Sequence, residues 1–196
     1  MMVNGATPMP IQIGQRADHG FDEPLGLLSD CHRRIEHFLR VLSTIAADAV
    51  GGPLTPDYRR ALEGALRYFA EAAPRHTADE EVSLFPRLRT AGSATAHAMA
   101  ALDRLERDHH EADAHHAEVD RLARRWLEHD GLPHAEADAL REHLVRLEAL
   151  YADHIAVEDR DVFPAAAQAL DRAQLEQIGR EMAARRQVAP KTIERG

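Results

Sequence analysis

The chain has 196 residues, of which 24 are Lys or Arg and 33 are Asp or Glu, giving a formal net charge of -9 with the 13 histidines counted as neutral. A hydrophobic fraction of 44% beside 29% charged residues excludes a disordered acidic chain, and the length suits one domain or a small pair. The acidic balance, with no long Lys/Arg block, argues against a nucleic-acid partner, whose phosphates would need neutralising. We expect a globular protein, and the many helix-forming residues favour an all-α fold.

The chain shows no sign of secretion or of membrane insertion. A single cysteine, Cys31, excludes an intramolecular disulfide, and there is neither a signal-peptide pattern at the start nor a run of about 18 apolar residues. These features predict a cytoplasmic protein with no membrane partner. The 13 histidines are the unusual part of the composition, because imidazole is the commonest metal ligand.

The first 20 residues combine Pro and Gly without an apolar period, which predicts a flexible N-terminal arm over 1–20. From Pro24 apolar residues recur every three or four positions until Gly51-Gly52-Pro53, which indicates a first helix. A second helix is expected from Thr55, a good N-cap, to about Leu84. Pro74 should kink it just before His76.

Two further long helices and a short one complete the expected elements. The third follows Ala91-Gly92-Ser93 and ends near Gly131, the fourth starts at about His134, and a shorter amphipathic stretch covers 171–186. Short links between four long helices predict an antiparallel up-down-up-down four-helix bundle with a short extra C-terminal helix. The expected divisions are the arm at 1–20, the bundle at 21–170, and the C-terminal helix and tail at 171–196.

An eleven-residue frame occurs twice, at 76–86 and 154–164, each time as His, Glu four residues later, a second acid, two spacers, an aliphatic residue, Phe and Pro. The repeat indicates a duplicated helix pair. Aligning the first helix with the third at an offset of 77 residues then pairs the core-facing His32 with His109. We interpret the Phe-Pro pairs as packing and helix-ending elements, and Cys31 as a small packed residue.

Residues four apart share a helix face, so His76 with Glu80, and His154 with Glu158, can each clasp one cation. With His32 and His109 the bundle interior would hold four imidazoles and two carboxylates, whose burial a metal ion would compensate. The set suggests two metals bridged by Glu80 and Glu158, with iron preferred and manganese or zinc compatible. A lone His-x-x-x-Glu pair is common on helix surfaces, and His19/Glu23 and His32/Glu36 also have this spacing, so a purely structural bundle is the plain alternative. The repetition of the whole frame favours the metal site.

At these residues the chain resembles the hemerythrin-like, or HHE cation-binding, domains over about Phe21 to Leu170. The resemblance implies a non-haem di-iron centre in which the four histidines are terminal ligands and the two glutamates bridge the irons. The oxygen-carrying members have a second histidine four residues after the first on the third helix, where this chain has Asp113. The departure predicts an open position on one iron, or a substitute ligand from among Glu36, Asp113 and His116. We expect His143 to have a core or outer role.

The leading hypothesis of function is a non-enzymatic di-iron protein that binds or senses a small diatomic ligand, oxygen or nitric oxide, or handles iron under oxidative stress. The alternative is a di-iron oxidase, a peroxidase-like enzyme or a nitric oxide reducing enzyme, because an open metal position can activate a ligand as well as hold it. A ferritin-like carboxylate bundle is a third hypothesis, but those sites use Glu-x-x-His on two helices and only Glu106/His109 has that spacing.

Overall fold

The structure is a computed structural model that describes residues 18–91 and 96–188. Most of the predicted N-terminal arm and the end of the predicted tail lie outside these residues. Within them all regular structure is helical, which confirms the all-α prediction. The elements are α1 (Pro24–Ala49), α2 (Pro56–Glu71), α3 (Ala73–Ala78), the π-helix η1 (Asp79–Leu84), α4 (Phe85–Thr90), α5 (Ala96–His129), α6 (His134–Val157), the π-helix η2 (Glu158–Val162), α7 (Phe163–Ala169) and α8 (Arg172–Arg185).

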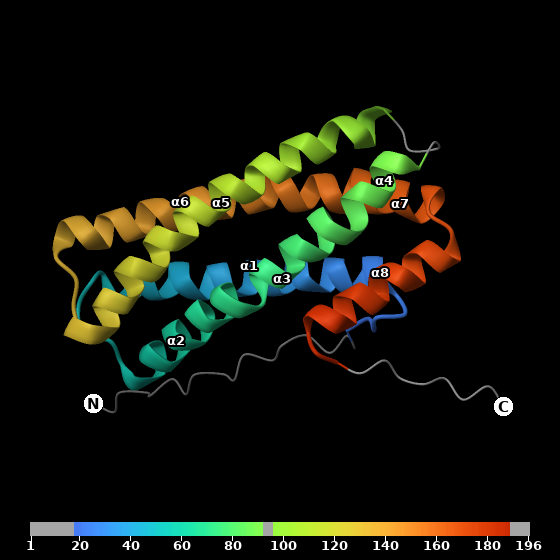
Figure 1. Ribbon diagram of the computed structural model, residues 1–196. Helices are drawn as coiled ribbons and strands as arrows, with labels where there is room; N and C mark the ends of the chain where they lie inside the picture. The colour runs from blue at the N-terminus through green and yellow to red at the C-terminus, as the bar shows by residue number, and fades with distance from the viewer. Residues whose placement is uncertain (1–17, 92–95, 189–196) are drawn as a thin grey trace, which may run out of the picture.

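Four long helical segments run between the two ends of the molecule, and the second and third are tilted relative to the other two in the view of Figure 1. The first is α1, the second runs from α2 through η1 to α4, the third is α5, and the fourth runs from α6 through η2 to α7. The chain passes from one end of the molecule to the other in each segment, and α8 lies against η1 and α1 (Figure 1). None of the helices in the described ranges combines the length and apolar character that a membrane crossing requires.

The local sequence explains where the second segment begins and where it is interrupted. The Thr55 hydroxyl caps α2 by accepting a hydrogen bond from the Tyr58 N–H at 3.2 Å, as its sequence position predicts. The α-helix is interrupted at Ala72, and Pro74 lies in the first turn of α3, where its missing N–H is not required. The predicted break before His76 is therefore confirmed.

Both copies of the repeated frame widen into a π-helix where a continuous α-helix was expected. The Phe85 N–H donates to the Glu80 carbonyl and the Phe163 N–H donates to the Glu158 carbonyl, each five residues back. Each Pro that follows lies in the first turn of the next α-helix. The prediction that Phe-Pro ends the helices is wrong, because the wide turn lets the helix continue past the proline.

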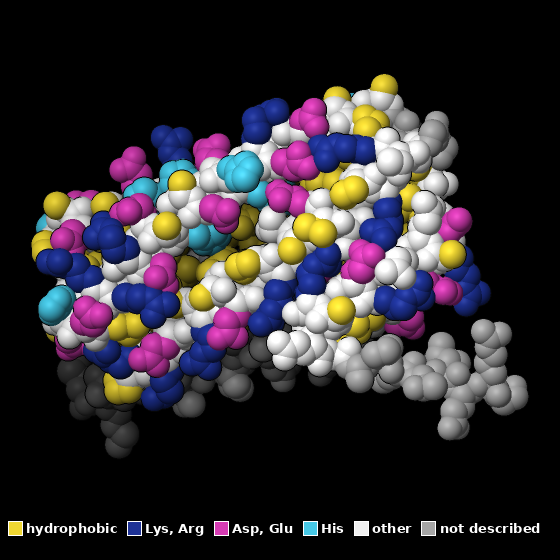
Figure 2. Space-filling model, viewed as in Figure 1, with side chains coloured by type: hydrophobic (Ala, Val, Ile, Leu, Met, Phe, Trp, Pro, Cys, Tyr) yellow, Lys and Arg dark blue, Asp and Glu magenta, His cyan; other side chains and the backbone are white. Residues whose placement is uncertain are grey.

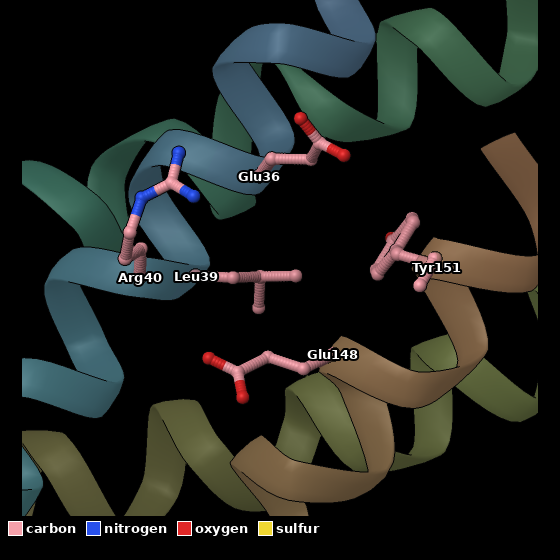
Figure 3. A pocket seen from close by; sticks show the side chains of 6 residues that line it. Glu36, Leu39, Arg40, Glu148 and Tyr151 are labelled. Atoms are coloured by element: carbon pink, nitrogen blue, oxygen red, sulfur yellow. The ribbon is translucent and has the colours of Figure 1, made fainter.

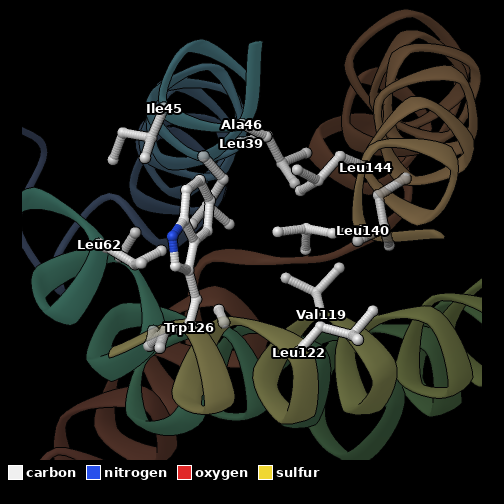
Figure 4. Packing of buried hydrophobic residues seen from close by; sticks show 14 of the residues in the cluster. Leu39, Ile45, Ala46, Leu62, Val119, Leu122, Trp126, Leu140 and Leu144 are labelled. Carbon is white, nitrogen blue, oxygen red and sulfur yellow. The ribbon is translucent and has the colours of Figure 1, made fainter. Parts of the chain in front are cut away.

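Two apolar clusters fill the bundle, one toward each end. The first contains Trp126 and side chains from α1, α2, α5 and α6, and Figure 4 shows its leucines around the indole ring. The second joins the start of α1 to η1, α4, α5, η2, α7 and α8. In the chain, His76 and Glu80 lie between Leu66 of the first cluster and Leu84 of the second, and Glu158 lies between Ile155 of the first and Val162 of the second. These buried polar side chains therefore lie between the two apolar clusters. On the outside, acidic and basic side chains are interspersed over the face shown in Figure 2.

Candidate metal centre

Six side chains predicted as ligands converge in the interior from all four segments. Each is at most 5% exposed: His32 on α1, His76 on α3, Glu80 on η1, His109 on α5, His154 on α6 and Glu158 on η2. In both His-x-x-x-Glu pairs the histidine lies in the last part of an α-helix and the glutamate lies at the start of the π-helix that follows. The α-helical spacing of four residues, which places imidazole and carboxylate on one face, therefore still applies to each pair. π-turns of this kind recur at functional sites.

The six residues form two overlapping sets with two shared carboxylates. His32 and His76 belong to one set and His109 and His154 to the other, while Glu80 and Glu158 belong to both; within each set one ligand atom per residue lies within 4.8 Å of all the others. Glu80 Oε1 is 3.2 Å from His76 Nε2, and Glu80 Oε2 is 3.3 Å from His109 Nε2. Its two oxygens thus face different histidine pairs, as a bridging carboxylate requires.

Glu158 also lies close to both histidine pairs, but through a single oxygen. Its Oε2 lies 3.0 Å from His32 Nε2 and 3.2 Å from His154 Nε2. Among the described residues, both carboxylate oxygens of Glu80 and of Glu158 are buried without a hydrogen-bond partner, as are Nε2 of His32 and of His154. Such groups are costly unless something compensates them, and this donor set of imidazole nitrogens and carboxylate oxygens fits iron, manganese or zinc.

The electrostatics of the metal-free cluster favour charged side chains. Burial acts to raise the pKa of Glu80, but His76, His109 and His32 hold it well below its usual value. Burial acts to lower the pKa of His109, but Glu80 and Glu81 raise it to about 9. The pKa of His32 is likewise well above its ordinary value, against burial, because Asp159, Glu158 and Glu80 surround it. Protons therefore occupy imidazoles that a metal ion would need.

Two histidines have a further carboxylate hydrogen bonded to their outer nitrogen, which the sequence reasoning missed. Glu81 lies 2.8 Å from His109 Nδ1, and Asp159 lies 3.2 Å from His32 Nδ1. These two are the second acids of the repeated frame, and each reaches a histidine of the other half of the chain. The acid that follows each glutamate in both copies was the available signal. Partners of this kind fix the tautomer and orientation of a ligating imidazole.

The residues that precede His32 and His109 lie beside the remaining two histidines, whose Nδ1 atoms have no hydrogen-bond partner among the described residues. Asp108 Oδ2 lies 3.5 Å from His154 Nδ1, and the Cys31 thiol is the corresponding neighbour of His76. Burial acts to raise the pKa of Cys31, but His76 and Arg34 lower it. Cys31 is buried, as expected, and a candidate ligand is among the groups that lower its pKa.

The three candidate additional ligands lie outside the cluster. Asp113 and Glu36 are exposed, and Glu36 lines a pocket of about 280 Å³ between α1 and α6, facing Tyr151 (Figure 3). His116 Nε2 is hydrogen bonded to the Tyr151 hydroxyl at 3.1 Å. Burial and the neighbouring His115 lower the pKa of His116 to about 4, so its ring is neutral. The half-buried His143 pairs with His115 on α5 at 2.9 Å, at the contact between α5 and α6.

Asp159→Asn and Glu81→Gln are each expected to weaken metal binding by about 10- to 100-fold, because an amide no longer draws the ring proton to Nδ1 as a carboxylate does. Chelator competition on the purified full-length protein measures this loss. Asp153→Asn, which changes a 72% exposed carboxylate on α6, is the matched control and should bind as the parent does. Equal affinities in all four proteins would contradict a positioning role for the two outer acids.

Comparison with known families bears directly on this geometry. The model of the hemerythrin HHE cation-binding domain matches residues 23–166. The chain belongs to this family. An uncharacterized protein of Haemophilus influenzae is 30% identical over 169 residues, which cover 86% of this chain and 92% of the relative. Membership of the hemerythrin HHE family confirms the resemblance and supports metal binding, typically of iron, at the His/Glu clusters of the bundle.

Proposed function

We propose that the protein is a carboxylate-bridged di-iron protein that binds or senses a small diatomic ligand, oxygen or nitric oxide, or handles iron under oxidative stress. The observation that carries the proposal is the pair of overlapping ligand sets that share Glu80 and Glu158. His32 and His76 would hold one ion, and His109 and His154 the other. An antiparallel order of the four segments, as the sequence predicts, would bring one histidine from each segment to the same depth.

Bound iron would supply redox chemistry and open coordination positions for the small ligand. The protein contributes the surroundings. Two apolar clusters flank the site and exclude water, which strengthens the attraction between the carboxylates and the cations. The outer acids Glu81 and Asp159 hold two of the imidazoles with their Nε2 atoms directed inward. Since Asp113 and Glu36 are exposed, we propose that no side chain replaces the second histidine found in oxygen carriers.

Metal analysis of the iron-reconstituted, full-length protein tests this function. We expect close to two iron ions per chain and near-ultraviolet or visible absorption that changes when oxygen or nitric oxide is added to the anaerobically reduced protein. Consumption of the ligand over many turnovers would instead indicate the enzymatic alternative. Iron content near zero would leave a buried network of imidazoles and carboxylates with a structural role alone.

The affinity for divalent metal is expected to rise from pH 6 to about pH 9, because binding must displace protons from His32, His76 and His109, whose pKa values are all raised. The same shifts act on the metal-free fold. A histidine with a raised pKa stabilises the metal-free fold fully below about pH 6.5. For His109 this contribution is lost as the pH rises through about 9. The lowered pKa of Glu80 adds stability above about pH 4.5 that is lost on acidification. Calorimetric titration with cobalt(II) in two buffers of different ionisation enthalpy counts the released protons; an affinity independent of pH would contradict this account.

A further inference from the structure

The last residue of the C-terminal helix α8 and its C-cap residue supply the charges that surround a buried acid next to the candidate centre. Asp79 immediately precedes Glu80 on η1 and is 0% exposed. Its two oxygens accept hydrogen bonds from Arg185 at 2.8 Å and from Arg186 at 2.6 Å. A buried carboxylate that lost these partners would be strongly unfavourable, so the position of Asp79 depends on α8.

A second contact joins α8 to η1 one turn further along. The buried Ser83 hydroxyl accepts a hydrogen bond from Arg185 at 2.7 Å and donates one to Glu181 at 2.5 Å. Glu181 also accepts a hydrogen bond from Arg87 at 2.7 Å. Because Arg185 contacts both Asp79 and Ser83, it bridges nearly the whole length of the π-helix.

Apolar contacts fix α8 beneath these charges. Ile178 and Met182 are fully buried in the second apolar cluster. Gly179 lies so close to the chain before α1 that a Cβ atom there would stand 1.8 Å from the Phe21 carbonyl oxygen. The helix is therefore held in one position against both α1 and η1.

Within residues 18–91 and 96–188, the other half of the repeat has no equivalent of this arrangement. When the two copies of the repeated frame are aligned, Val157 takes the position of Asp79 and Asp161 takes the position of Ser83. Asp161 pairs with Arg160, whose side chain is 69% exposed. The family match ends at residue 166, before α8 begins. The contacts to Asp79 and Ser83 thus come from outside the matched domain and reach only one of its two π-helices.

We infer that α8 acts as a clamp on η1, with Arg185 and Arg186 as positioning residues that hold Glu80 and Glu81 in the arrangement the centre needs. The metal-dependent part of this inference rests on the proposed function. The mechanical part does not, because it concerns how firmly η1 is held with or without metal.

The test compares two clamp variants of the full-length protein, Ser83→Ala and the double variant Arg185→Gln/Arg186→Gln, with the parent. Arg172→Gln/Arg180→Gln, which changes two exposed arginines of the same helix, is the matched control. Amide hydrogen exchange of the metal-free proteins is followed by mass spectrometry over 79–84 and 158–162. Transfer of bound cobalt(II) to a chelator is timed separately.

We expect faster exchange over 79–84 with unchanged exchange over 158–162, and metal loss roughly 10-fold faster in the clamp variants but not in the control. Adding Asp79→Asn to the double arginine variant removes the unpaired charge. It should recover much of the melting temperature while metal loss stays fast, which a role in folding alone would not produce.

Uniformly raised exchange, unchanged exchange over 79–84, or equally fast metal loss in the control would each overturn the clamp. A parent protein that binds no metal would overturn the proposed function instead. In that case the exchange measurements on metal-free protein still decide whether α8 holds η1.

Discussion

Replacing Glu80 with Gln is expected to lower the affinity for both metal ions by more than roughly 100-fold, since even the outer partners of metal ligands contribute about 10- to 100-fold. Glu80 has one oxygen facing His76 and the other facing His109, so a single substitution affects both halves of the centre. An amide keeps the shape of the side chain but lacks the charge and one acceptor oxygen. Metal content after reconstitution, measured beside circular dichroism to verify folding, gives the result.

The chain contains a matched control for this substitution. Glu36 follows His32 at the same spacing of four, but it is exposed and lines the pocket between α1 and α6. Glu36→Gln should therefore bind two ions as the parent does. Loss of metal in Glu36→Gln, or full metal content in Glu80→Gln, would contradict the assignment of ligands.

Removal of metal is expected to lower the melting temperature by roughly 8–16 °C. Free metal at about 1,000 times its dissociation constant stabilises a fold by about 4 kcal/mol, and 1 kcal/mol corresponds to about 2–4 °C in a chain of 150–250 residues. The effect arises because the candidate ligands come from all four segments, which the ions would tie together. Scanning calorimetry with and without chelator measures it.

The Glu80→Gln variant provides the internal reference for the thermal experiment. Its melting temperature should respond to chelator much less than that of the parent, whereas Glu36→Gln should respond as the parent does. Equal melting temperatures of the parent with and without chelator would show that the bound ions, if any, do not lie in the core.

Periodicity and repetition were sufficient to predict the helices and the six inward side chains. His32 and His109 were found because an offset of 77 aligns the apolar stripes of two helices, and burial follows directly from such a stripe. The two His-x-x-x-Glu pairs were found because the frame repeats. These signals are local, and local sequence determines the face of a helix.

Contacts between segments that are distant in the chain were harder to predict from the sequence. The π-helices could have been suspected from the proline six residues after each glutamate, because a proline cannot donate to the carbonyl four residues back. The partners of His109 and His32 depend on how the segments rotate against one another. Nothing in the sequence around Asp79 indicates two arginines more than 100 residues away.

The exchange of outer acids between the halves of the chain has an evolutionary consequence. Glu81 belongs to the first half and supports His109 of the second, while Asp159 of the second supports His32 of the first. Glu80 and Glu158 are likewise shared by both ligand sets. A primordial helical hairpin carrying one copy of the frame could complete such a centre only by associating with a second hairpin of the same kind. Gene fusion would then have made that association permanent and freed each copy to diverge, as the acid Asp79 in one copy and Val157 in the other illustrate.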